Sequence, residues 1–173
     1  KLIRRVLIKK GELTRWERSF LIWWSNVGLR RSSLEELEQA EENEGEDECC
    51  QIAYAPNYKF LDSGADHMVT VKCGCQLHLP VVNLTRSEFC IFHNPELEVP
   101  ELPLDLVKVD RLIKKCGLGG HSGRRTAAYS IRLELEKKSA TKEIGKVANA
   151  QLKWSRGGGE GMIRYYSSDF KAW

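Results

Sequence analysis

The sequence predicts an α+β protein, a small mixed fold with an N-terminal amphipathic helix, a central β region and a C-terminal strand-helix-strand unit. Two kinds of hydrophobic periodicity predict this class. Apolar residues recur at helical spacing in 14–27 and 106–116, whereas they alternate with polar residues in 69–81 and 126–138. A chain of 173 residues is long enough for one domain or two small ones with a sizeable core.

The first predicted helix runs from about residue 14 to residue 27. Thr14 and Glu17 have the Thr-x-x-Glu spacing of a capping box, in which both side chains accept hydrogen bonds from backbone N–H groups at the helix start. Gly28 is a natural stop. Apolar residues follow at helical spacing: Trp16, Phe20, Trp23, Trp24 and Val27. We expect this aromatic stripe to be core or a partner-binding face rather than a platform for stacking bases.

Charge is strongly segregated along the chain. Residues 1–31 carry nine Lys or Arg against two Glu, residues 32–50 carry nine acids and no base, and residues 108–173 carry fifteen bases against six acids. The acidic segment 33–50 has little apolar material, so we expect a flexible linker or an interaction tail. A second capping box, Ser33 to Glu36, predicts a short acidic helix at its start.

The middle of the chain alternates like a β region. Val69 and Val71 lead into a tight Cys-Gly-Cys turn, and apolar residues alternate again after it, which predicts two strands. Asp105 is then expected to cap a helix that Gly117 ends. Beyond a glycine-rich turn, 126–138 predicts a half-buried strand, 139–152 a helix and 161–166 a final strand.

We therefore divide the chain into four segments. They are a basic helical segment 1–32, an acidic linker 33–50, a β region 51–100 and a basic α+β region 101–173. No run of about 20 apolar residues predicts a membrane span. The chain begins at Lys1 rather than Met, so we expect a processed or trimmed chain.

Cysteine and histidine spacing predicts a metal site in the β region. Cys73, Cys75, Cys90 and His93 offer the four thiolate or imidazole ligands that structural Zn²⁺ takes in a tetrahedron. Four protein ligands leave no position for water, so the metal would stabilise a zinc-knuckle β region rather than catalyse. Close cysteine neighbours form poor disulfides, which favours a reducing compartment, the cytoplasm or nucleus. The alternative is a set of small buried hydrophobes with unrelated histidines. Other side chains could replace a ligand, namely His67, His78, Cys116 and His121.

The two basic ends predict nucleic acid, RNA or DNA, as a partner, because Lys and Arg contacts to phosphate supply most non-specific affinity. The predicted contacts are Arg15, Arg18, Arg30, Arg31, Lys114, Lys115, Arg124 and Arg125. Such charges can also form an ordinary solvated face or pair with the acidic middle. A second hypothesis is a protein-interaction adaptor that binds a regulatory protein through the acidic tract and the Trp-rich helix.

The glycine-rich stretch 116–123 predicts an anion nest of backbone N–H groups beside Arg124 and Arg125. Within it, Gly120-His121-Ser122-Gly123 resembles the Gly-x-Ser-Gly turn around the nucleophile of leader serine proteases of the plant potyvirus type. The resemblance implies Ser122 as nucleophile, His78 as base and Glu88 as the residue that orients the base. The acid is Asp rather than Glu in the more usual pattern.

Two further resemblances concern the cysteines. The acidic tract before a Val-rich strand and closely spaced cysteines is similar to the small zinc-binding transforming proteins of papillomaviruses, although their paired Cys-x-x-Cys motifs are absent. The Cys-Gly-Cys turn followed by histidine is similar to geminivirus transcriptional activators, although their downstream ligand spacing is absent. Both resemblances imply a regulatory or accessory protein of viral type.

Overall fold

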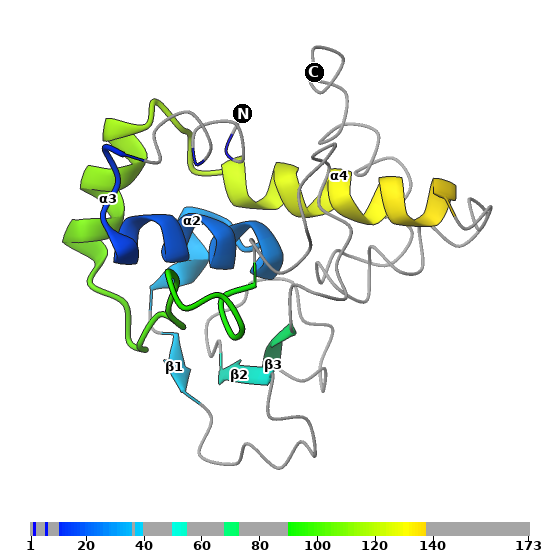
Figure 1. Cartoon of the computed structure of the whole chain (residues 1–173), viewed down its shortest axis with the longest axis horizontal. Coiled ribbons are helices and arrows are strands. Elements are labelled where there is room, and N and C mark those ends of the chain that lie inside the picture. Colours follow the sequence, from blue (N-terminus) through cyan, green and yellow to red (C-terminus); the bar gives the residue numbers. More distant parts are fainter. Residues whose placement is uncertain are drawn as a thin grey trace.

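A computed structural model describes residues 2, 6, 11–35, 37–39, 50–54, 68–72 and 90–137. The helix α2 lies between the helix α4 and the strands β1 to β3, and α3 lies beside one end of α2 (Figure 1). The predicted helix 139–152 and final strand 161–166 lie outside the described residues. The α+β class and the four-segment division therefore stay predictions.

The first predicted helix is confirmed as α2, Arg15–Val27. Thr14 is its N-cap: its hydroxyl accepts from the N–H of Glu17 at 3.1 Å, and a Glu17 carboxylate oxygen accepts from the N–H of Thr14 at 3.0 Å. Gly28 ends the helix with a positive φ of 67°, a conformation that costs glycine little. Local sequence signals therefore determine both ends of α2.

A short 3₁₀ helix and a small sheet follow α2. The 3₁₀ helix η1 spans Arg31–Leu34 and is followed by β1, Glu38–Gln39. The predicted acidic helix starting at Ser33 is therefore wrong. Leu34 and Leu37 are both buried in the core, and this burial favours a chain that turns into the sheet over a helix exposed to water.

The sheet has the order β1-β2-β3, with both neighbouring pairs antiparallel. β2 spans Cys50–Tyr54 and β3 spans Met68–Lys72. Cys50 pairs with Lys72, and Ile52 pairs with Thr70. The predicted strand through Val69 and Val71 is thus confirmed, and it ends one residue before the predicted ligand Cys73.

The helix predicted after Asp105 is confirmed as α3, Leu106–Lys115. The Asp105 carboxylate accepts hydrogen bonds from the N–H groups of Val107 and Lys108 at 3.1 and 3.2 Å. Gly117 follows the C-cap with a φ of 60°. The inward face carries Val109 and Leu112, both buried.

The strand predicted over 126–138 is wrong, because residues 126–137 belong to the helix α4, Ser122–Lys137. The segment is rich in Ala, Arg, Leu, Glu and Lys, which have high helix propensity, and its alternation of apolar and polar residues is short. Burial has helical spacing instead. The buried residues at the start of α4 are Gly123, Arg124, Thr126, Ala127 and Ala128.

One hydrophobic core surrounds α2. Phe20, Trp23 and Trp24 are fully buried, so the aromatic stripe of α2 is core. Trp16 is partly buried and stacks on Phe20 with ring centroids 5.4 Å apart. The core also takes residues from each of the other predicted segments, including Leu34, Leu37, Val71, Ile91, Leu97, Val109 and Leu112. The described parts of the four segments therefore pack together, including the start of the predicted linker.

Candidate nucleic-acid interface

Both predicted phosphate contacts on α2 face the acidic segment 96–98. Arg15 donates to the carbonyl oxygen of Leu97 at 2.7 Å, and its Nε lies 4.0 Å from a carboxylate oxygen of Glu98. Nη1 of Arg18 lies 3.7 Å from a carboxylate oxygen of Glu96. An acidic partner so close offsets much of the attraction of each arginine for a phosphate.

Two more of the predicted contacts pair with acids across the fold. Arg31 makes a bidentate ion pair with Asp110, with Nε 2.6 Å from Oδ1 and Nη2 2.8 Å from Oδ2. Nζ of Lys115 lies 2.9 Å from Oε2 of Glu17. The sequence suggested a broad basic surface, but these side chains join α3 to η1 and α2.

The other four predicted contacts divide between two places. Lys114 is exposed in the last turn of α3, where a positive charge suits the negative end of the helix dipole. The remaining three lie around the N-terminus of α4, with His121 among them. We call this group the His121 cluster, and its members are Arg30, His121, Arg124 and Arg125.

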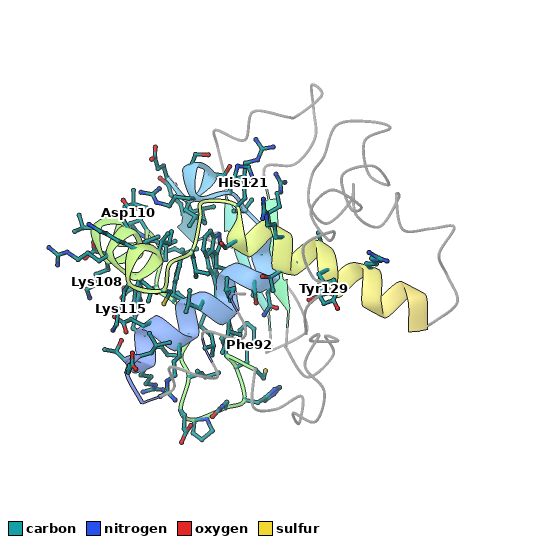
Figure 2. The ribbon with its side chains drawn as sticks, turned by 90° about the horizontal axis from the view of Figure 1, so that it is seen from above. Phe92, Lys108, Asp110, Lys115, His121 and Tyr129 are labelled. Carbon is teal, nitrogen blue, oxygen red and sulfur yellow. The ribbon has the colours of Figure 1, made fainter. Side chains whose placement is uncertain are left out.

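Backbone contacts bring the members of the His121 cluster together. The N–H of Arg31 donates to the carbonyl oxygen of Gly120 at 2.8 Å, which holds the start of η1 against the turn before α4. His121 directly precedes α4, and Figure 2 shows it away from the α3 side chains Lys108 and Asp110. Arg30 therefore comes from one segment and the other members from another, 91 residues later in the case of His121.

Electrostatics within the cluster are those of crowded positive charges. Desolvation, followed by the charges of Arg30, Arg124 and Arg125, lowers the pKa of His121. The Arg124 side chain is only 1% exposed, so it adds to the local field but cannot contact a ligand directly. Arg30 and Arg125 are half-buried and His121 is exposed. The cluster can therefore attract an anion at the positive end of α4.

The anion nest predicted over 116–123 is not formed by the first N–H groups of this turn. Those of Gly117 and Leu118 donate to carbonyl oxygens of α3, at 3.0 and 2.9 Å. The N–H of Gly119 donates to the hydroxyl oxygen of Ser122 at 3.0 Å, and that of Ser122 donates to the carbonyl oxygen of Gly119. These hydrogen bonds shape the turn, so these N–H groups are not available to bind an anion.

Ser122, the nucleophile of the protease hypothesis, is the first residue of α4. Its hydroxyl is half-buried and accepts the hydrogen bond from Gly119, which is a turn-stabilising role. His78 and Glu88, the other two members of the proposed triad, lie outside the described residues. The geometry of Ser122 gives the protease hypothesis no support beyond its sequence motif.

The predicted zinc ligands Cys90 and His93 come together. Cys90 is buried and its Sγ lies 3.3 Å from Nδ1 of His93, which is exposed. Cys73 and Cys75 lie outside the described residues, as do His67 and His78. In the part of the chain that the structure describes, no three His, Cys, Asp or Glu side chains form a group able to hold a metal ion. Cys116 and His121 therefore do not complete a site with Cys90 and His93.

Two residues near the His121 cluster escaped the sequence analysis. In the predicted strand, Tyr129 and Arg132 would lie on opposite faces. In α4 they share a face with Arg125, because Tyr129 follows Arg125 by four residues and Arg132 follows Tyr129 by three. The signal that could have found them is the high helix propensity of this segment.

The chain was compared with known proteins at three levels. No protein-family model, no curated protein and no solved structure matches it. Within the described ranges, no helix is long and apolar enough to cross a membrane. Functional conclusions must therefore come from the site itself.

Proposed function

We propose that this protein is a nucleic-acid-binding regulatory or accessory protein, and that the His121 cluster is where it contacts phosphate. The observation that carries the proposal is the convergence of Arg30, Arg124 and Arg125 on His121 at the N-terminus of a 16-residue helix. Guanidinium groups and a helix N-terminus are both common phosphate-binding elements in proteins. The site includes three of the eight basic residues that charge alone predicted as phosphate contacts.

Competition with internal acids supports this choice of site. Arg15, Arg18, Arg31 and Lys115 each have a carboxylate within 4.0 Å. The charges that lower the pKa of His121 are all positive. The carboxylates offset the attraction of these four bases for a phosphate, and we place the phosphate contact where three arginine charges act on one histidine.

The adaptor alternative is weaker for a similar structural reason. Trp23 and Trp24 are fully buried, so they cannot reach a partner without disruption of the core. Trp16, which is partly buried, and the acidic tract are the parts of that hypothesis that remain as contacts. A pull-down lost on deletion of 40–49, with no nucleic acid retained, would favour the adaptor.

Fluorescence anisotropy with a labelled oligonucleotide across a salt series tests the nucleic-acid proposal. We expect the double variant R30Q/R125Q to bind more weakly and to lower the slope of log affinity against log salt by about 1.4 to 1.8, the value for two lost phosphate contacts. The control is R111Q/K114Q, which removes two exposed charges from α3. Absence of binding at low salt, binding without salt dependence, or equal losses in both double variants would contradict the proposal.

We further propose that Zn²⁺ stabilises the β region through Cys73, Cys75, Cys90 and His93. The observation that favours it is the 3.3 Å between Sγ of Cys90 and Nδ1 of His93. Tetrahedral zinc with bonds of about 2.3 Å to sulfur and 2.0 Å to nitrogen separates two such atoms by about 3.5 Å. Neither Cys90 nor Cys116 is in a disulfide, which suits a reducing compartment such as the cytoplasm or nucleus.

Metal analysis of purified protein tests the zinc proposal. We expect one zinc per chain, lost in C90S and in C73S, and a chelator should lower the unfolding temperature of the wild type. The control is C116S, because Cys116 is a buried thiol that forms no metal-binding group with Cys90 and His93 in the described part of the chain. Metal-free wild type, or zinc retained by both C90S and C73S, would exclude the site.

A further inference from the structure

The outward face of α3 is basic and exposed to water. Val107, Arg111 and Lys114 follow one another at spacings of four and three residues, so they share one helix face, away from the buried Val109 and Leu112. All three are exposed, and Val107 is 60% exposed. Within the described part of the chain, neither Arg111 nor Lys114 has an ion pair. This face is therefore available to a partner.

Ion pairs at both edges of this face hold α3 in place. Asp110 on one side pairs with Arg31, and Lys115 on the other pairs with Glu17. Figure 2 shows α3 at the edge of the described residues, with Asp110 and Lys115 on either side of it. A face that is already ordered loses little conformational entropy when a partner binds.

A surface of complementary chemistry comes directly before α3. The stretch 94–107 contains four acidic residues and no Lys or Arg. Exposure alternates along its second half: Val99, Glu101, Pro103 and Asp105 are exposed, whereas Pro100, Leu102 and Leu104 are buried. Val99 and Val107 are the two exposed large hydrophobic residues in the described part of the chain. One of them therefore lies among acids and the other among bases.

We propose that the outward face of α3 docks a second copy of this chain, with Val99 of that copy against Val107 and its Glu101 against Arg111. This inference goes beyond the proposed function and does not depend on it. The spacings of the two surfaces match. At the rise of an extended chain, Glu101 lies about 6.7 Å from Val99, and Arg111 lies about 6 Å along the helix axis from Val107.

The chemistry of this face favours a protein over a nucleic acid as its occupant. A phosphate gains nothing from an exposed valine, and Asp110 at the edge of the face repels it. A segment with one apolar residue, followed two residues later by a carboxylate, is complementary to both Val107 and Arg111. The exposed Lys114 adds a second positive charge, and the stretch 94–107 of the second copy has no base to oppose it.

Sedimentation equilibrium of the nuclease-treated full chain gives the first test. We expect an average mass that rises above that of the monomer as protein concentration increases from micromolar to millimolar. The association should weaken with added salt, because screening reduces the attraction between exposed charges. Circular dichroism of each variant separates loss of association from loss of fold.

Charge reversal tests the pairing of Glu101 with Arg111. E101R and R111E should each weaken the association by about tenfold or more, because like charges then face each other across the contact. The double variant E101R/R111E restores opposite charges and should associate within about threefold of the wild type. The control is E38R, which makes the same change of charge at an exposed residue of β1. V107D tests the apolar contact and should also weaken the association.

Four outcomes overturn the inference. One is a mass that stays at the monomer value over the whole concentration range. Equal weakening in E101R and E38R would show that net charge matters rather than this contact. A double variant that associates no better than either single variant would exclude the pairing. Association that nuclease treatment abolishes would mean that nucleic acid bridges the copies, and would leave the proposed function standing.

Discussion

Gly123 lies against the indole ring of Trp24 so closely that a Cβ at position 123 would be 2.6 Å from two of its ring atoms. The ring itself is held, because its Nε1 donates to the carbonyl oxygen of Leu29 at 2.7 Å. Because Gly123 has no side chain, α4 can approach α2 closely. This approach also fixes the position of the His121 cluster at the start of α4.

Replacement of Gly123 by alanine should destabilise the protein. Alanine is favoured over glycine in a helix by about 1 kcal/mol, but overpacking against a held ring costs about 1 to 3 kcal/mol, and the 2.6 Å approach favours the upper part of that range. Urea unfolding measures the net loss. G119A is the control, because a Cβ there meets nothing within 4 Å. Equal stability of G123A and wild type would show that α2 and α4 can separate at little cost.

The ion pair between Arg31 and Asp110 should give a small, pH-dependent stabilisation. The hydrogen bond from Arg31 lowers the pKa of Asp110 below its ordinary value of 3.8. A carboxylate with a lowered pKa stabilises the fold above that ordinary value and loses the effect as pH falls through the folded pKa. Asp110 is largely exposed, so we expect D110N to lose at most about 1 kcal/mol at neutral pH.

Urea unfolding at pH 7 and at about pH 3 checks this expectation, since the difference between wild type and D110N should shrink at the lower pH. R31Q and the double variant R31Q/D110N complete a double-mutant cycle. A cycle without coupling energy at pH 7 would mean that the bidentate contact stabilises nothing.

The capping box at the start of α2 should be worth about 1 kcal/mol. T14A removes the hydroxyl that accepts from the N–H of Glu17 and leaves that donor without its cap. T14S keeps the hydroxyl and should be close to the wild type. Denaturant midpoints of the three proteins measure the difference. If T14A were as stable as T14S, packing alone rather than the cap would determine where α2 begins.

Binding of nucleic acid should strengthen as the pH falls below about 6.5. Desolvation and three neighbouring arginines lower the pKa of His121 in the free protein, and a bound phosphate offsets the arginine charges, so the complex takes up a proton more readily. The affinity for nucleic acid therefore rises as the pH falls through the interval between two pKa values of His121, the higher one in the complex and the lower one in the free protein.

Anisotropy from pH 5 to pH 8, a range of about three units around the ordinary histidine pKa, measures this dependence. At the highest pH, H121Q should bind nucleic acid as tightly as the wild type. At the lowest pH, it should lack most of the additional affinity that the wild type gains. H121K is the control, because a lysine keeps a positive charge over this whole range and should remove most of the pH dependence. A pH dependence identical in wild type and H121Q would exclude His121 from the contact.

Much of α2 and α3 could be predicted from sequence because their signals are local. The caps Thr14 and Asp105 lie within three residues of the N–H groups that they accept from. The stop signal Gly28 needs only its own backbone conformation. The candidate site was less predictable, since whether a base meets an acid or another base depends on partners far away in sequence. Arg31 and Asp110 are 79 residues apart, and Lys115 and Glu17 are 98 apart.

The sequence alone thus determined where α2 and α3 begin and end, and it indicated the chemistry of the basic residues and of Cys90 with His93. Tertiary structure decided the rest. It placed 126–137 in a helix, because burial against α2 adds to the high helix propensity of this segment. The period of so short an alternation cannot by itself distinguish a strand from a helix. It also brought Arg31 to Asp110 and Lys115 to Glu17, because Coulomb attraction depends on distances that only the packed chain defines.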